Sequence, residues 1–191
     1  MSDEQSARTS EAPPPQAAET PGKLQLPHTR HCLVCGRDNP LELKLDCFVD
    51  PVTGKVSADF VATKHHAGFE GIVHGGLVST IMDEVMTWAA TWNIKRLCLC
   101  GELSVRFRQS VIVGQKVHVE AIVDFSRPKL IEPSAKIFDE QNRLMVTAAG
   151  KYVPLTPEQH GQHLKSFIDV PATRAAAAML GIQTPVSKPH E

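Results

Sequence analysis

The stretch that decides the fold of this chain is Gly71-Ile-Val-His-Gly-Gly-Leu-Val-Ser-Thr-Ile-Met-Asp-Glu84. The glycine pair Gly75 and Gly76 opens an apolar run with helical character. A helix start exposes unpaired N–H groups with about half a unit of positive charge, and glycine lets a ligand approach them closely. Asp83 and its neighbour follow about two turns later, where a buried carboxylate is costly. Oxyanion donors together with a buried acid are the parts of an acyl-transfer or thioester-cleaving site.

Hydrophobic periodicity predicts one helix and a set of strands around it. The helix is predicted over residues 77–92 and is apolar nearly all round, so we expect a sheet to wrap it. Before it, residues 41–47 and 56–62 alternate with period two across a turn at residues 50–54, which predicts a hairpin. Similar alternation predicts later strands over residues 102–108, 117–124, 134–139 and 143–153. The prediction is therefore an α+β fold, a curved antiparallel sheet wrapped around one long central helix.

The two ends of the chain differ from this middle part. Residues 1–27 are rich in Ser, Glu, Ala, Pro and Gln, and they cannot bury enough apolar surface to offset chain entropy. We therefore expect a disordered N-terminal arm, followed by a folded domain over residues 28–155. In the C-terminal tail, residues 156–191, the alanine-rich segment 171–180 ends at Gly181, which predicts one short helix.

Composition excludes several classes of function. The chain has 191 residues, 42% of them apolar and 21% charged, and its 20 basic and 21 acidic side chains give a net charge of −1. This balance indicates neither nucleic-acid nor membrane binding, and no apolar run approaches the roughly 18 residues of a membrane span. The acidic N-terminus, with Asp3, Glu4 and Glu11, predicts no secretory signal. The odd number of five cysteines fits a reducing, cytoplasmic location.

A glycine-x-x-histidine-glycine-glycine helix start with an acid further along resembles the hotdog fold. More narrowly, it resembles the PaaI-like acyl-CoA thioesterases of phenylacetate pathways. The residues that match the spacing of this branch are Gly71, His74, Gly75, Gly76 and Asp83. The Cys32-x-x-Cys35-Gly36 opening and the Glu102-Leu-Ser-Val-Arg-Phe segment also resemble members of that family. The resemblance covers roughly residues 30–155.

The resemblance implies hydrolysis of an acyl-CoA to a free acid and coenzyme A, with no metal and no cofactor beyond the coenzyme A of the substrate. The N–H of Gly75 would polarise the thioester carbonyl, Asp83 would act as nucleophile or general base, and His74 would hold the loop and substrate. Further substrate contacts are expected at Gly76, His66, Glu84 and Cys100. The favoured acyl group is small, medium-chain or aromatic.

Two positions depart from the family pattern. Many relatives have Asn or Gln near Ala67 or Gly68, and many have Ser or Thr at the position of Cys100. The replaced groups help to orient the acid or the water. A non-catalytic protein that binds or senses acyl-CoA is therefore the alternative function.

The distance between the two main site residues predicts the assembly. Eight residues separate Gly75 from Asp83, roughly 12 Å along a helix, so one helix cannot place both on one thioester. Two antiparallel helices could, with Gly75 from one chain and Asp83 from the other. We therefore expect a homodimer with two composite sites, with a homotetramer as the larger alternative, and no nucleic-acid or membrane partner.

Two interpretations stay open at this point. On helical spacing alone, Glu84 rivals Asp83 as the catalytic acid, and the family position favours Asp83. A ligand-like spacing is shared by His28, His31, Cys32 and Cys35. Structural zinc has four ligands, and Cys98 and Cys100 could complete the set. A thioredoxin-type redox motif would need a βαβ setting, which the pattern lacks. We expect a small turn with buried thiols, and zinc is the alternative.

Overall fold

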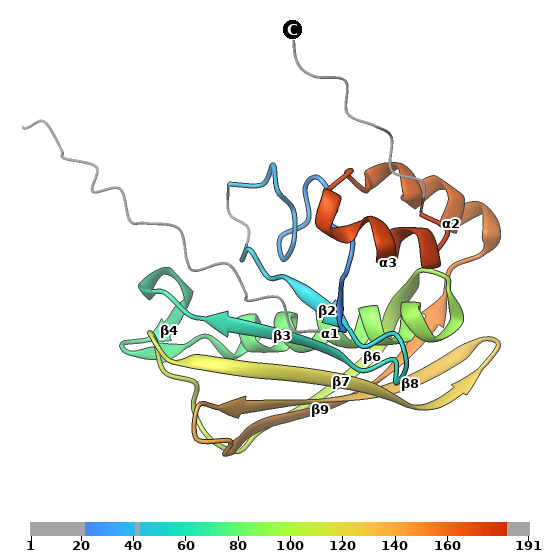
Figure 1. Ribbon diagram of the computed structural model, residues 1–191. Helices are drawn as coiled ribbons and strands as arrows, with labels where there is room; N and C mark the ends of the chain where they lie inside the picture. The colour runs from blue at the N-terminus through green and yellow to red at the C-terminus, as the bar shows by residue number, and fades with distance from the viewer. Residues whose placement is uncertain (1–21, 41–42, 183–191) are drawn as a thin grey trace, which may run out of the picture.

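One long helix and one curved sheet make up most of the computed structural model, which describes residues 22–40 and 43–182 (Figure 1). The helix α1 spans Gly75–Ile94, with His74 as its N-cap, and ends where Lys95 adopts the left-handed conformation (φ 56°). Its buried side chains point in several directions around the axis, as the apolar sequence requires. The predicted helix is confirmed and is two residues longer at each end. None of the described helices has the length and apolar character needed to span a membrane.

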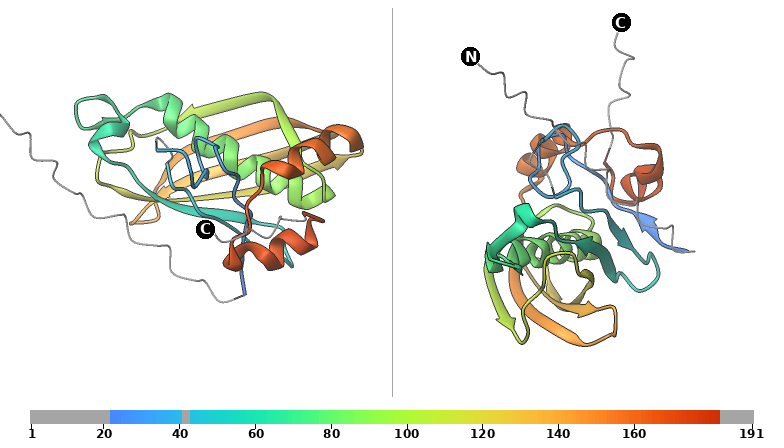
Figure 2. Two further views of the ribbon diagram at one scale, coloured as in Figure 1. Left: turned by 90° about the horizontal axis from the view of Figure 1, so that it is seen from above. Right: turned by 90° about the vertical axis from the view of Figure 1, so that its left-hand side faces the viewer.

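Seven strands form the main sheet in the order β1-β2-β3-β7-β8-β9-β6, and every neighbouring pair is antiparallel. Their bounds are Leu24–Gln25 (β1), Cys47–Val49 (β2), Val56–Val61 (β3), Cys98–Phe107 (β6), Lys116–Arg127 (β7), Leu130–Asp139 (β8) and Leu144–Pro154 (β9). Figure 2 shows the sheet curving around α1. The predicted α+β arrangement is confirmed.

The core lies between α1 and the concave face of the sheet. On β3 the inward residues Val56, Ala58 and Phe60 alternate with outward ones and pair in register with inward residues of β7. Met82 and Val85 of α1 are fully buried against this face. Each such aliphatic side chain contributes about 1.5–3 kcal/mol on burial, so the alternation read from the sequence is what holds the sheet on the helix.

The strand predicted over residues 41–47 is wrong in its bounds. β2 begins only at Cys47, and the first two residues of the prediction lie outside the described part of the chain. Lys44 is in the left-handed region (φ 54°), which interrupts the extended path. The N–H of Leu45 donates to the carbonyl of Val34 at 3.1 Å, so the apolar alternation here packs against the cysteine loop and forms no ladder.

The N-terminal boundary of the folded part lies earlier than predicted. Of the expected arm, residues 1–21 lie outside the described residues, but Leu24–Gln25 form β1 and pair with β2. Leu26 is 1% exposed and belongs to the core, which explains why the segment is ordered before residue 28.

The C-terminal segment forms a cover of short helices. It contains α2 (Pro157–His163), which the sequence analysis did not predict, and α3 (Arg174–Met179). The helix predicted over residues 171–180 is present as a 3-10 turn, Pro171–Thr173, that runs into α3. Gly181 follows with φ 68°, as the predicted stop signal requires, and residues 183–191 lie outside the described part. Figures 1 and 2 show α3 beside β1.

Candidate active site

The start of α1 presents a backbone donor that no described residue uses. Nδ1 of His74 accepts the N–H of Gly76 at 2.9 Å, and the carbonyl of His74 accepts that of Leu77 at 3.0 Å. A Cβ at Gly76 would lie 2.9 Å from Nδ1, so glycine is needed for the ring to close over the helix end. The N–H of Gly75 makes no hydrogen bond to any described residue. It is therefore available to a ligand at the positive end of the helix.

A cavity of about 480 Å³ opens beside this donor. It is lined by the loop before α1, by the first turn of α1 and by the chain just after β6. His74 and Gly75 form one wall, and Phe69, Val78 and Phe107 give the cavity an apolar character. Its size is in the range of small-molecule sites, and a mostly apolar lining with a few polar groups, here including Arg108, Gln109 and Ser110, is typical of them.

The loop before α1 has more structure than predicted. Residues 64–74 contain a 3-10 turn, Lys64–His66, and a two-stranded ribbon of β4 (Ala67–Phe69) and β5 (Ile72–Val73). A Cβ at Gly68 would lie only 3.0 Å from Cα of His74. A side chain at position 68 would therefore crowd His74, and glycine suits this close approach of ribbon and helix start.

His66, a predicted substrate contact, holds this loop in place. Its Nδ1 accepts the N–H of Thr63 at 3.0 Å, and its carbonyl accepts the N–H of His74 at 2.9 Å. Its ring packs on Phe60 with centroids 5.4 Å apart. Burial, and the neighbouring His65, lower the pKa of His66. In the structure its visible role is to position His74.

Asp83 lies at the opposite end of β6 from the cavity, where Tyr152 fixes its carboxylate. The phenol O–H donates to Oδ1 at 2.7 Å, and Tyr152 is 0% exposed. Cys100 pairs with Tyr152 across β6 and β9. Burial and the bond to Asp83 raise the pKa of Tyr152, so the phenol stays protonated and donates. Burial, and then the charge of Asp83, raise the pKa of Cys100, which keeps that thiol neutral at pH 7.

Glu84 faces a different set of neighbours. Nε1–H of Trp88 donates to Oε1 of Glu84 at 3.0 Å. The sulfur atoms of Cys32 and Cys35 and a carboxylate oxygen of Glu84 all lie within 4.8 Å of one another. Burial raises the pKa of Glu84 to about 7, and the nearby Cys32 adds to this effect. The hydrogen bond from the Cys35 thiol lowers the pKa of Cys32.

Comparisons with known proteins agree with this architecture. Residues 70–146 match the family model of the thioesterase superfamily. The fold is the hotdog thioesterase fold. A solved thioesterase superfamily protein superposes with a TM-score of 0.60 at 22% identity, over 65% of this chain and 60% of that one.

Two further hotdog structures are similar. The PaaI protein of the Escherichia coli phenylacetic acid degradation operon has a TM-score of 0.55 at 15% identity, over 60% of this chain and 81% of that one. An acyl-CoA hydrolase of Staphylococcus aureus, in complex with butyryl coenzyme A, has a TM-score of 0.53 at 16% identity, over 56% of this chain and 66% of that one. The chain thus spans less than two thirds of the first of these structures. No curated protein sequence matches it.

The predicted site residues of this hotdog domain lie in three places. At the cavity are His74 and Gly75, with His66 and Gly76 supporting them. Around Tyr152 lie Asp83 and Cys100. Glu84 lies with Cys32 and Cys35 and does not line the cavity, and the hydroxyl of Tyr152 bonds to Asp83 instead. The sequence analysis missed Tyr152, although it is the one tyrosine of the chain and lies in a predicted strand.

The histidine and cysteine spacing near the N-terminus is not brought together as one set of ligands. His28 is buried and lies 3.0 Å from the carboxylate of Asp46, and both contact Arg37. Burial alone would raise the pKa of Asp46, but the hydrogen bonds and charges of His28 and Arg37 lower it. The thiol of Cys98 donates to a backbone carbonyl, and its N–H donates to Thr91.

Proposed function

We propose that this protein hydrolyses an acyl-CoA thioester to a carboxylic acid and coenzyme A. The observation that carries the proposal is the N–H of Gly75, which has no hydrogen-bond partner among the described residues and belongs to a residue that lines the cavity at the start of α1. There it would donate to the thioester oxygen as negative charge develops, and one such donor is worth about 2.7–4 kcal/mol of barrier. A cavity of about 480 Å³ suits a small, medium-chain or aromatic acyl group.

Asp83 supplies the second chemical group. As nucleophile it would attack the thioester carbon, and as general base it would take a proton from the attacking water. Tyr152 holds Oδ1 at 2.7 Å and thereby orients the other carboxylate oxygen. Tyr152 is thus a positioning residue, and Cys100 borders the same acid.

A second copy of the chain would bring these two groups together. β6 ends the sheet and has no strand partner on its outer side among the described residues, while Leu99 and Phe107 are 58% and 50% exposed. Phe107 lies beside Gly75, and Cys100 lies beside Asp83. Antiparallel pairing of two β6 strands places the Phe107 end of one against the Cys100 end of the other. Gly75 of one chain then approaches Asp83 of its partner, so a homodimer carries two composite sites.

The direct test of the oxyanion donor is Gly75→Pro. Proline removes the N–H but suits the first position of a helix, and the preceding His74 already has the extended backbone (φ −61°, ψ 128°) that proline requires. With a panel of acyl-CoAs and a thiol-detecting dye, we expect Gly75→Pro to lower kcat by about 10²–10³-fold.

Gly75→Ala is the matched control, because it keeps the N–H and its Cβ would meet Phe107 at an ordinary 3.4 Å. A reaction without substrate corrects for the thiols of the protein itself. If wild-type protein releases no thiol from any acyl-CoA of the panel, the hydrolase proposal is wrong. If the two variants are equally active, the N–H of Gly75 is not the oxyanion donor.

Mixing two inactive variants tests the composite site. A dimer of one Gly75→Pro chain and one Asp83→Asn chain has one intact site, so refolding the two together should restore about a quarter of wild-type activity. No recovery, or a protein that sediments as a monomer at assay concentration, would contradict the shared site.

A non-catalytic acyl-CoA binding protein is the second candidate. It is favoured by the neutral thiol of Cys100, a weak donor where many relatives have a hydroxyl beside the acid. Calorimetric binding of an acyl-CoA without thiol release would identify this function.

A further inference from the structure

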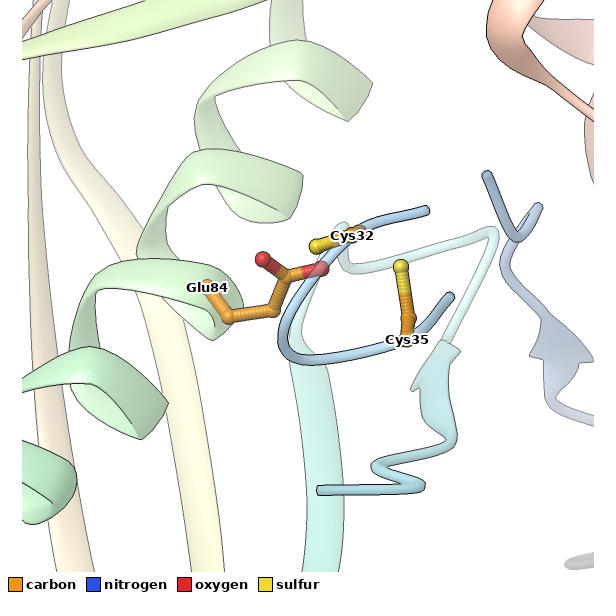
Figure 3. A group of neighbouring side chains, drawn as sticks. All are labelled: Cys32, Cys35 and Glu84. Carbon is orange, nitrogen blue, oxygen red and sulfur yellow. The ribbon is translucent and has the colours of Figure 1, made fainter. Parts of the chain in front are cut away.

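Two cysteines and one acid meet at a place that the proposed hydrolysis does not use. Figure 3 shows the carboxyl group of Glu84, from α1, directed toward the side chains of Cys32 and Cys35 in the N-terminal loop. The three ligand atoms lie within 4.8 Å of one another. Cys35 is buried, the other two are partly buried, and none of the three lines the cavity beside Gly75. The cluster is therefore separate from the candidate active site.

The cysteine loop is folded so that both thiols face the same side. The N–H of Val34 donates to Sγ of Cys32 at 3.3 Å, and the N–H of Gly36 donates to the carbonyl of Cys32 at 3.0 Å. A Cβ at Gly36 would lie 2.3 Å from that carbonyl oxygen, so this turn requires glycine. An N–H directed at sulfur stabilises the thiolate, which is the form that binds a metal.

Glu84 is held ready by a partner outside the cluster. The indole of Trp88 donates to Oε1 at 3.0 Å and fixes the orientation of the carboxyl group, as outer hydrogen bonds do for metal ligands. No described Lys, Arg or His forms an ion pair with Glu84. Two sulfur atoms and a carboxylate oxygen that converge in this way form a donor set of the kind that binds transition-metal cations.

We propose that Cys32, Cys35 and Glu84 bind one zinc ion, with a fourth coordination position left to water. Two thiolates select zinc over magnesium or calcium. In a tetrahedral site with Zn–S bonds of about 2.3 Å, ligand atoms are about 3.8 Å apart, so small side-chain movements bring this cluster to that geometry. The ion would tie the N-terminal loop to α1, at the residue next to Asp83.

This ligand set differs from the one that spacing alone suggests. His28 is occupied by Arg37 and Asp46, and it lies outside the cluster. The third ligand comes instead from the central helix, far away in the sequence. The small turn with buried thiols that we expect from the sequence is thus also the frame of a metal site.

Metal analysis of the full-length protein tests the proposal. Protein purified under reducing conditions from zinc-supplemented medium should contain about one zinc per chain, and cobalt substitution should give the near-ultraviolet absorption of thiolate-bound cobalt. Cys32→Ser and Cys35→Ser should remove both signals, and Glu84→Gln should weaken zinc binding at least about tenfold. Cys100→Ser is the matched control and should keep both.

A zinc titration of the stripped wild-type protein decides the matter even if the serine variants fold poorly. We expect its melting temperature to rise with zinc and to fall again with chelator. The proposal is overturned if the wild-type protein contains no zinc and its melting temperature does not change when zinc is added. It is equally overturned if Cys32 and Cys35 join in a disulfide that forms as readily with zinc as without it.

Discussion

Asp83 and Glu84 are neighbours in the sequence, yet the fold gives them different surroundings. Asp83 receives a hydrogen bond from Tyr152 of β9 and lies near Cys100 on the edge strand β6. Glu84 receives its hydrogen bond from Trp88 of its own helix and faces the cysteine loop. Consecutive residues of a helix differ by a rotation of about 100° around its axis. Asp83 therefore faces the edge strand β6, whereas Glu84 faces the loop that carries Cys32 and Cys35. The two carboxylates therefore lie in two separate environments.

The surroundings of Asp83 and Glu84 also favour different chemical roles for the two acids. A phenol bonded to Asp83 orients that acid beside an edge that a second chain can reach. Burial raises the pKa of Glu84 to about 7, and the nearby Cys32 adds to this effect. The first environment suits an acid that reacts, and the second suits one that binds a positive ion.

The largest effect is expected from Asp83→Asn. Losing the acid while keeping its shape should lower kcat by about 10²–10⁴-fold in the thiol-release assay, with an unchanged circular dichroism spectrum. Asp124→Asn, an exposed acid on β7, is the matched control and should retain the wild-type rate. If Glu84→Gln lowers kcat as much as Asp83→Asn, the distinction between the two acids fails.

The next effect concerns pH and the metal-free protein. The pKa of Glu84 is raised from 4.5 to about 7, so the folded state keeps a proton that the unfolded chain has lost. Stability from this group is complete below pH 4.5 and is lost as the pH rises toward 7, by up to about 3 kcal/mol. In urea unfolding with chelator present, the free energy of unfolding of the wild-type protein should therefore fall relative to that of Glu84→Gln between pH 4.5 and 7. A difference that does not vary with pH contradicts the assignment.

A smaller effect separates the two donors. Tyr152→Phe removes the bond to Asp83, so we expect kcat to fall about tenfold with KM nearly unchanged, because the acid is less well positioned. Trp88→Phe removes the bond to Glu84 and should affect zinc binding and stability more than kcat. Steady-state kinetics and zinc titration of both variants make the comparison. Equal losses of kcat would show that Tyr152 has no special role.

The smallest effect concerns the helix cap. His74→Ala removes the acceptor for the N–H of Gly76 and should cost about 0.5–2 kcal/mol of stability, measured by thermal unfolding. His163→Ala, an exposed histidine at the end of α2, should leave the melting temperature unchanged. If His74→Ala instead lost all activity while its melting temperature stayed unchanged, this would indicate that His74 contacts the substrate directly.

Local signals made much of the fold predictable. The all-round apolar character of residues 77–92 and the period-two alternation after them determine where α1 and the later strands lie. The strand over residues 41–47 failed because a left-handed residue, Lys44, leaves the alternation intact while it bends the backbone. β1 was missed because two residues carry too little periodicity to read.

In the candidate site, too, contacts between near neighbours in the sequence were easier to predict than contacts between distant segments. The cap of His74 on Gly76 is a contact between near neighbours, and it agrees with the expectation that His74 holds the loop. The bond from Tyr152 to Asp83 and the meeting of Glu84 with the cysteines depend on how distant segments pack. Such pairs follow from strand register and helix rotation together, which a single sequence does not reveal.

Within the described residues no strand pairs with the outer side of β6, and the proposed dimer there would make activity depend on protein concentration. If two chains must join there before either can cleave a thioester, activity per chain falls on dilution, and subunit exchange governs turnover. A peptide segment bound along this edge of β6 would block the proposed dimer and thereby inactivate both composite sites, without contacting any reacting atom.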